Sequence, residues 1–306
     1  MTRLSNCKIK QIIREVERDG KSPFQVAPDF KITVRRIQQI VRAYKRTGIV
    51  PKLNPNRRPK TELTPLQKKA IDSAWNETFL SAKLLYIELK NRRGIKIPKN
   101  KIYSYLKETG RTIPDPKKQK QRKRCRYERD HSGSLVHSDT HEINAGKSKF
   151  CILWLDDASR LILAGGEFET KEEKNSIETF KKAFEEAKKW NVKIRQVNTD
   201  HGSEYGAHRE NGCGQFAKVA ENLDVEIVLS RIRNPQTNGK IERLWQEYER
   251  HRWRFKSFDD WKNWYNRRLH GALNLEWAES PLEAFQRKML PEEMLGLFFQ
   301  KSGRGL

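Results

Sequence analysis

The sequence predicts an α+β or mixed α/β protein, in which a mixed five-stranded sheet with helices on both faces follows all-α segments. Apolar residues recur at helical spacing up to about residue 110, and runs typical of strands begin only after residue 133. From there the predicted order is strand, strand, strand, helix, strand, helix, strand, helix, which combines an antiparallel hairpin with βαβ crossovers. Residues 1–131 hold 35 Lys and Arg against 12 Asp and Glu, whereas residues 132–306 hold 28 against 27.

This uneven charge indicates a polyanionic partner. The net charge is +23 over residues 1–131 and +1 over residues 132–306. Nucleic acid is the usual partner for a field of this size. A membrane surface would also fit the charge, but the basic half contains no basic amphipathic helix with a Trp, Phe and Leu face.

The composition excludes several classes of protein. The 306 residues are enough for one large domain or roughly two to four small ones. No run of 18 apolar residues is present, so no membrane span is expected, and the first residues lack the apolar stretch of a signal peptide. The cysteines are dispersed without a CxxC pair, which disfavours a disulfide scaffold or a cysteine-rich zinc site and favours a reducing cytosol. They are Cys7, Cys125, Cys151 and Cys213.

Residues 1–49 are predicted to form three short helices. Thr33 is expected to cap the third helix and Gly48 to end it. Three helices with tight turns match a helix-turn-helix, whose last helix enters the major groove. Four polar residues of that helix lie off its apolar stripe and could reach phosphates and base edges, or could merely keep a small bundle soluble. These residues are Arg35, Arg36, Gln39 and Arg42.

Three further segments complete the basic half. Residues 50–61 carry three prolines and four basic residues and are predicted to be an extended linker, in which Arg57 and Arg58 could follow a groove. Residues 62–110 are predicted to be a second helical unit, of helix-turn-helix or winged-helix type, with Lys99 and Lys101 as its DNA-facing candidates. Residues 111–131 hold nine Lys and Arg against three acids and are predicted to be a basic linker ordered by nucleic acid. Its candidate DNA ligands are Arg122, Lys123 and Arg124.

Residues 132–256 are predicted to form the sheet-containing core, and residues 257–306 a helical tail. Alternation and apolar runs predict strands over 135–139, 150–155, 160–164, 192–198 and 225–229. Amphipathic patterns predict helices over 171–190, over 215–223 and from residue 240.

Three acidic residues stand out by their context. Asp139 ends the first predicted strand, Asp200 follows the fourth, and Glu242 lies in the first turn of a helix. Adjacent first and fourth strands would bring the two aspartates together, with Glu242 on a helix packed beside them. Three neighbouring carboxylates need cations, and oxygen ligands favour Mg²⁺ or Mn²⁺. Two such ions, about 3.5–4 Å apart, would clamp the attacking and leaving oxygens of a phosphodiester.

Around these residues the sequence resembles the DDE transposases and retroviral-type integrases, and in particular insertion-sequence transposases with a helix-turn-helix N-terminus. The resemblance rests on Asp139 and on the segments 153–160, 200–205, 234–245, 264–270 and 280–284. It implies an RNase H-like core, with Asp139, Asp200 and Glu242 as catalytic metal ligands. Two departures are the 41 residues between Asp200 and Glu242, a long interval, and the absence of histidine in residues 1–100, which excludes the retroviral zinc module.

The resemblance implies a transposase that cleaves DNA at element ends with water and then joins the freed 3′-OH to target DNA. Its implied partners are the terminal inverted repeats, target DNA and at least one further copy of the chain, in the nucleoid of a prokaryotic cytoplasm. A catalytically inactive DNA-binding regulator and an RNase H-like nuclease without strand transfer are the alternatives. Deletion of residues 1–110 is expected to remove sequence-specific binding and to leave a folded core.

Several neighbours of the acids could have either a structural or a functional role. Asp156 and Asp157 are expected to form a turn rather than to bind metal. Glu249 is expected to be a surface ion-pair partner, and His141 either positions water or phosphate or has a hydrogen-bonded structural role. Two basic residues of the last core helix are candidates for holding DNA phosphates near the metals. They are Lys240 and Arg243.

Overall fold

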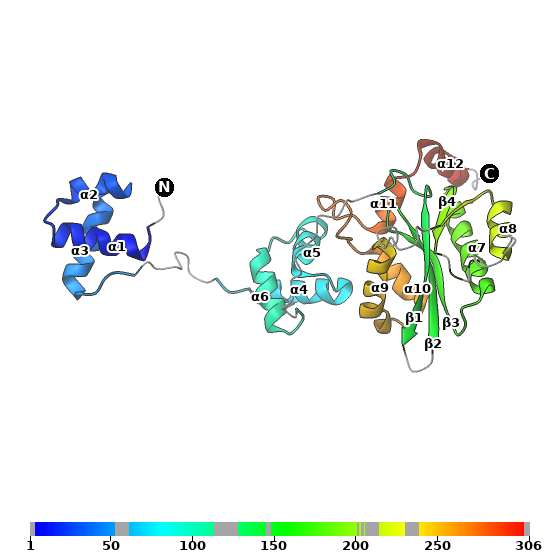
Figure 1. The fold of residues 1–306 in the computed structure, drawn as a ribbon, viewed down its shortest axis with the longest axis horizontal. Coiled ribbons are helices and arrows are strands. Elements are labelled where there is room, and N and C mark those ends of the chain that lie inside the picture. The colour runs from blue at the N-terminus through cyan, green and yellow to red at the C-terminus, as the bar shows by residue number, and fades with distance from the viewer. Residues whose placement is uncertain are drawn as a thin grey trace. The chain divides into compact units, whose positions relative to one another are not determined.

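The computed structural model describes residues 4–52, 61–112, 128–144, 148–200, 202, 205, 214–229 and 239–302. The chain divides into two compact units, Met1–Glu62 and Leu63–Leu306. Figure 1 shows the elements of both units.

The first unit is a bundle of three helices at the predicted places. They are α1 (Asn6–Glu17), α2 (Pro23–Phe30) and α3 (Val34–Thr47). Thr33 caps α3 by accepting a hydrogen bond from the backbone of Arg36, and Gly48 ends the helix in the left-handed region, with φ of 66°. Apolar residues from all three helices, among them Ile12, Val26 and Ile37, form one buried cluster.

The second unit begins with a helical segment that packs against the C-terminal part of the chain. It contains α4 (Pro65–Thr78), α5 (Ala82–Ile87), a π-helical turn (Glu88–Arg92) and α6 (Lys99–Glu108). Its buried residues, such as Leu85 and Ile102, share one apolar cluster with Leu269 and Ala278. This shared cluster is evidence against the expectation that deletion of residues 1–110 leaves a folded core, because the tail would lose its apolar partner.

Polar contacts strengthen the same junction. The Asn91 side chain donates a hydrogen bond to the carbonyl oxygen of Glu276 at 2.8 Å, and the Trp264 indole donates to that of Glu77 at 2.8 Å. Arg92 forms an ion pair with Glu283 at 2.7 Å. The boundaries expected at residues 110, 131 and 256 stay predictions.

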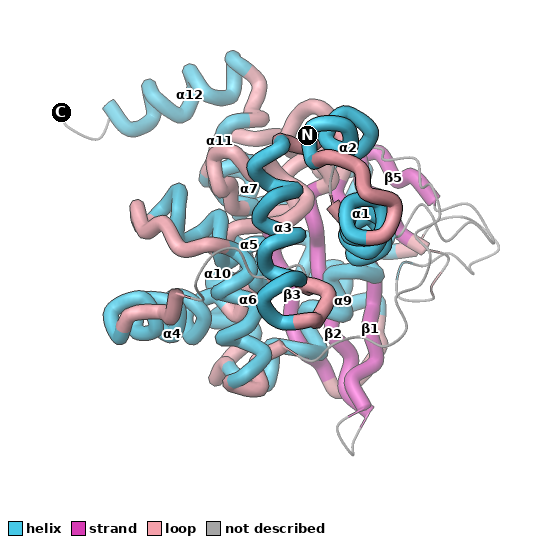
Figure 2. The backbone as a smooth tube through the Cα atoms, turned by 90° about the vertical axis from the view of Figure 1, so that its left-hand side faces the viewer, coloured by secondary structure: helices cyan, strands magenta, loops and turns pink. Residues whose placement is uncertain are grey.

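A five-stranded sheet forms the centre of the second unit, as predicted. Its strands are β1 (Val136–Asn144), β2 (Ser148–Asp156), β3 (Ile162–Phe168), β4 (Gln196–Thr199) and β5 (Glu226–Leu229). Their order is β3-β2-β1-β4-β5, with antiparallel β1–β2 and β2–β3 pairs and parallel β1–β4 and β4–β5 pairs. The strands lie side by side in Figure 2. The prediction that the first and fourth strands are neighbours is confirmed.

All five strands differ in length from the prediction: β1, β2 and β3 are longer, and β4 and β5 are shorter. β1 continues five residues beyond Asp139, because its polar second half stays paired with β2 as far as Asn144 and Ser148. Backbone pairing of this kind needs no apolar side chains, so the apolar pattern ends before the strand does. β4 is shorter than predicted, because it begins only at Gln196.

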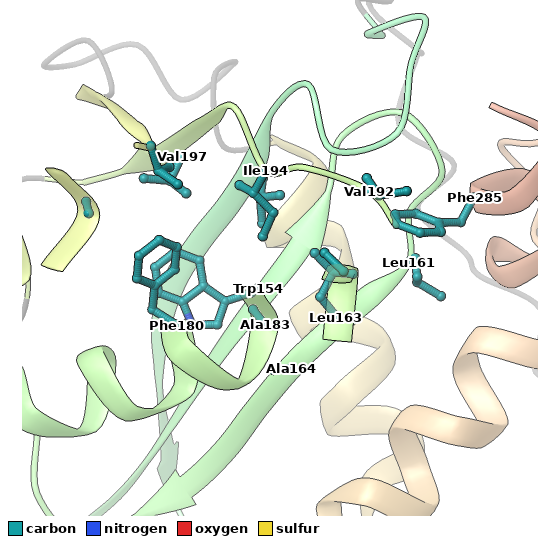
Figure 3. Close-up of a cluster of buried hydrophobic side chains, with 14 of the residues drawn as sticks. Trp154, Leu161, Leu163, Ala164, Phe180, Ala183, Val192, Ile194, Val197 and Phe285 are labelled. Atoms are coloured by element: carbon teal, nitrogen blue, oxygen red, sulfur yellow. The ribbon is translucent and has the colours of Figure 1, made fainter. Parts of the chain in front are cut away.

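Helices cover both faces of the sheet. On one face α7 (Glu173–Lys189) and α8 (Gln215–Asn222) pack against Trp154, which is fully buried beside Phe180 and Phe216. Figure 3 shows Trp154 and Phe180 in this cluster. On the other face α9 (Gly239–His251) and α10 (Phe258–Arg267) cover Leu153 and Leu155. Successive residues of β2 thus enter different cores, as the alternation of a strand requires.

The remaining elements are a turn between α9 and α10 and two helices that come after α10. A short 3-10 turn (Arg252–Arg254) links α9 to α10, and α11 (Pro281–Arg287) and α12 (Pro291–Ser302) end the described chain. Phe285 of α11 lies in the same apolar cluster as Trp154. None of the helices in the described ranges combines the length and the apolar character that a bilayer crossing requires.

Candidate active site

Asp139 lies in β1, and Asp200 directly follows the neighbouring strand β4. The parallel pairing matches Val136 with Val197 and His137 with Asn198. Continuing this register by two residues places Asp139 beside Asp200, which directly follows β4. Side chains two residues apart share a face, and the contact between the His137 and Asn198 side chains, at 3.3 Å, lies on the face of both aspartates.

Helix α9 packs on this same face and carries Glu242 in its first turn, as predicted. The helix is held by buried Ile241, Leu244 and Trp245, which contact the cluster of Leu153 and Leu155. The Trp245 indole also donates a hydrogen bond to Asp139 Oδ2 at 2.9 Å. Because Glu242 lies three residues before Trp245, it is on the adjoining helical turn, where its side chain is exposed.

The three acids do not form a closed metal-binding group in this structure. Within the described ranges, no group of three or more His, Cys, Asp or Glu side chains is arranged to hold a metal ion. Asp139 and Asp200 are half-buried. Asp200 Oδ1 accepts a hydrogen bond from the backbone N–H of Gly202 at 2.9 Å. Residues 201, 203–204 and 206–213, which follow Asp200, lie outside the described residues. Residues 230–238, which precede α9, lie outside them as well.

The two acids of the turn between β2 and β3 have different surroundings. Asp156 accepts hydrogen bonds from the Ser159 backbone and hydroxyl and from the Gly133 backbone, so it forms the turn as predicted. Burial raises its pKa. Asp157 is fully buried and contacts His137 at 2.7 Å and the ammonium group of Lys240.

Asp157 and Lys240 each shift the pKa of the other through their opposite charges. Burial alone would raise the pKa of Asp157, but the hydrogen bond from His137 and the charges of His137 and Lys240 hold it below its usual range. Burial, together with the charge of Arg160, lowers the pKa of Lys240 to about 8, despite the opposite effect of Asp157. Sequence reasoning missed this pair because its partners are 83 residues apart.

The ring of His141 has structural contacts. It stacks on Trp245 with 4.9 Å between ring centroids, and its Nε2 lies 2.9 Å from a carboxylate oxygen of Glu249. Glu249 is thus a hydrogen-bond partner of His141, and its expected role in an ion pair stays a prediction. The sequence gives no signal that Trp245 contacts Asp139, because a tryptophan on an amphipathic helix is typically a core residue.

The predicted DNA-binding residues lie in several parts of the chain. In the first unit the exposed ones are Arg35, Arg36, Gln39 and Arg42, all on α3. In the second unit Lys99 and Arg243 are exposed, and Lys101 is half-buried. Lys240 is mostly buried, because its ammonium group is directed to Asp157. Arg57, Arg58, Arg122, Lys123 and Arg124 lie outside the described residues.

Two histidines lie at the ends of α9 and α10: His251 is buried at the end of α9, and His270 is partly buried just after α10. Burial, followed by the charge of Arg268, lowers the pKa of His251 to about 4 and that of His270 to about 3. Glu247 opposes the shift at both rings, and it forms an ion pair with Arg268. Both rings are therefore neutral in the folded protein at neutral pH.

We expect the free energy of unfolding to decrease as the pH is lowered below about 6.5. The two histidines bind protons near pH 6.5 in the unfolded chain, but only near their lowered pKa values in the folded chain. Their contribution to stability is therefore fully present above pH 6.5 and is lost as the pH falls towards 4. The loss at pH 5 is about 2 kcal/mol for each histidine. Urea unfolding at pH 7.5 and 5 measures it. His270→Asn should reduce this pH dependence, whereas exposed His131→Gln should not; an equal dependence in both variants would contradict the assignment.

The architecture of the second unit indicates its fold class. A mixed five-stranded sheet in this order, with helices on both faces, has the RNase H-like arrangement that the sequence predicts. The comparison with known proteins agrees with this class. The chain is 28% identical over 176 residues, or 53% of its length, to a protein of Spiroplasma virus SpV1-C74 named "Putative integrase ORF3". The resemblance to the integrase and transposase superfamily is therefore confirmed.

The extent of these similarities is limited. The aligned part is 47% of the viral relative, so the chain spans about half the length of the protein it matches. No family model matches the chain. Among solved structures, the simian T-cell lymphotropic virus intasome with a PP2A regulatory subunit has a TM-score of 0.39 and 14% identity, over 68% of this chain and 73% of that one. The catalytic core of BIV integrase has a TM-score of 0.38 and 13% identity, over 51% and 95%.

Proposed function

We propose that the chain is a DNA recombinase of the DDE transposase type. It binds the ends of a DNA element, cleaves a phosphodiester bond there with water, and joins the resulting 3′-OH to target DNA. In the first step water attacks phosphorus and the 3′-oxygen leaves. In the second that 3′-OH attacks a target phosphodiester, and a target 3′-oxygen leaves in turn.

The observation that carries this proposal is the parallel pairing of β1 with β4. Continued by two residues beyond His137 and Asn198, this register would bring Asp139 beside Asp200, and Trp245 of α9 contacts Asp139. The third acid, Glu242, belongs to the first turn of the same helix. The three acids thus belong to β1, to the residue that follows β4 and to α9, and both β4 and α9 contact β1.

The donor set fits divalent magnesium or manganese. Carboxylate oxygens are the ligands that both ions prefer, and Asp139, Asp200 and Glu242 would hold two of them. When bound, the ions would stabilise charge on the attacking and leaving oxygens. The protein contributes the fixed orientation of Asp139, because the Trp245 indole binds one of its two carboxylate oxygens.

DNA is the substrate that the charge favours. The chain carries a net charge of +24, almost all of it in residues 1–131. In the first unit α3 would read base edges through Gln39 and Arg42, with Arg35 and Arg36 available to phosphates. In the second unit the exposed Arg243, next to Glu242, would hold a phosphate near the acids. The viral relative, by its name an integrase, supports recombination chemistry in general terms.

The proposal is tested by nicking and joining assays on one preparation of the full chain. Nicking of a supercoiled plasmid is followed with Mg²⁺, with Mn²⁺ and with EDTA. Joining is followed with a labelled short duplex, which ends either in a 3′-OH or in a 3′-dideoxynucleotide. We expect nicking to require the metal and joining to require the 3′-OH. Nicking without joining would leave only a nuclease, and DNA binding without either reaction would leave only the inactive regulator.

A further inference from the structure

A chain of buried polar contacts connects the segments that carry the three acids. It begins at Asn198 of β4, whose Oδ1 lies 3.3 Å from His137 Nδ1. The other ring nitrogen, His137 Nε2, lies 2.7 Å from Asp157 Oδ1. The same oxygen of Asp157 accepts from the ammonium group of Lys240, at the start of α9. The chain of contacts therefore joins β4, β1, the turn after β2 and α9.

The members of this network have a regular relation to the acids. Each of the three outer members lies two residues before one acid, and on the two strands this spacing puts both residues on one face. The pairs are Asn198 and Asp200, His137 and Asp139, and Lys240 and Glu242. Asp157 belongs to none of the three segments, yet it contacts two of them directly and the third through His137.

We infer that Asp157 is a positioning residue that keeps the three acid-bearing segments together at the proposed metal site. This inference rests on the proposed function. It also gives Lys240 a different role from the one its sequence position suggests: its charge is used to fasten α9 to the sheet rather than to hold a DNA phosphate. The Lys240 side chain is only 12% exposed, and Asp157 is not exposed at all.

The contacts of Asp157 explain how one side chain can have this effect. Its second carboxylate oxygen accepts the backbone N–H of Arg129 at 2.8 Å, and its own N–H donates to the Leu135 carbonyl at 2.9 Å, so the carboxylate is fixed to the sheet. Removing the carboxylate charge leaves a buried ammonium group without its counterion, which is strongly unfavourable. Lys240 would then move towards water, and the first turn of α9, with Glu242, would lose its anchor.

The test measures Mn²⁺ binding to the full chain by titration calorimetry, with Asp157→Asn and Lys240→Gln. Each variant is expected to raise the Mn²⁺ dissociation constant about 10- to 100-fold, the usual effect of losing a group that orients metal ligands. High Mn²⁺ should restore plasmid nicking. The double variant should bind no more weakly than either single one, because both remove the same ion pair. Loss of folding would instead reduce the number of binding sites without changing the constant.

Two further variants make the result decisive. Lys182→Gln removes one exposed lysine of α7 that pairs with Glu178, and should leave the Mn²⁺ constant unchanged. Glu242→Gln removes a proposed ligand. If Glu242→Gln weakens Mn²⁺ binding but Asp157→Asn and Lys240→Gln do not, the inference about Asp157 is overturned and the proposed function stands. If Glu242→Gln has no effect either, the proposed metal site itself is wrong.

Discussion

Deletion of residues 1–110 is expected to destabilise the remaining chain severely, whereas deletion of residues 1–62 leaves it folded. The longer deletion removes α4–α6, and with them the apolar partners of Leu269 and Ala278, both of which are buried. Exposing Leu269 alone costs about 1.5–3 kcal/mol. The ion pair of Arg92 with Glu283 and the hydrogen bond between Trp264 and Glu77 are lost as well. Natural domains have a free energy of unfolding of only about 5–15 kcal/mol, so losing these contacts removes a large fraction of it.

Thermal melting followed by circular dichroism measures the difference between the two deletions. The chain without residues 1–62 should melt cooperatively, close to the melting temperature of this unit in the full chain. The chain without residues 1–110 should melt about 10 °C or more lower, or not cooperatively. Both deletions should remove sequence-specific DNA binding in a gel shift, because both remove α3. Equal melting temperatures would show that α4–α6 form an independent domain after all.

The fold class could be predicted because local patterns determine most of it. Helical spacing marks α1, α3 and α7, and the apolar run around Trp154 marks β2. The packing of α4–α6 on Leu269 and Ala278 could not be predicted, because it depends on contacts between residues more than 150 positions apart. Neither the sequence of α4–α6 nor that around Leu269 and Ala278 shows which apolar surface it packs against. A contiguous helical stretch bounded by prolines and charge therefore resembled a separate domain.

The three acids of the candidate site stay predictions, and two of their neighbours were not predicted. Asp139, Asp200 and Glu242 were singled out because each lies at the end of a predicted strand or the start of a predicted helix, within a distinctive motif. Trp245 and Asp157 were not assigned to the site, since a tryptophan on an amphipathic helix and an Asp in a turn both have ordinary structural roles. A signal was nevertheless present: a polar residue lies two positions before each acid, at the same strand face or helix start. Only the fold shows that His137 and Lys240 meet at the Asp157 carboxylate and that Asn198 joins them through His137.

The largest effect on activity is expected from Glu242→Gln, Asp139→Asn and Asp200→Asn, each of which replaces a proposed ligand oxygen with an amide nitrogen. An amide cannot supply the negative charge that two divalent ions require. We expect plasmid nicking and end joining to fall by about 10³-fold or more, equivalent to ~4 kcal/mol of transition-state stabilisation.

DNA binding and folding should be retained in these three variants. Glu242 is exposed, and α3, the proposed reader, belongs to the other unit. The matched control is Glu178→Gln, the same chemical change at an exposed position of α7, which should cleave at the parental rate. Cleavage by Glu242→Gln at the parental rate, with DNA binding intact, would remove Glu242 from the site. The common face of Asp139 and Asp200 would then need another third ligand, and Asp157 would have no proposed ligand on α9 to position.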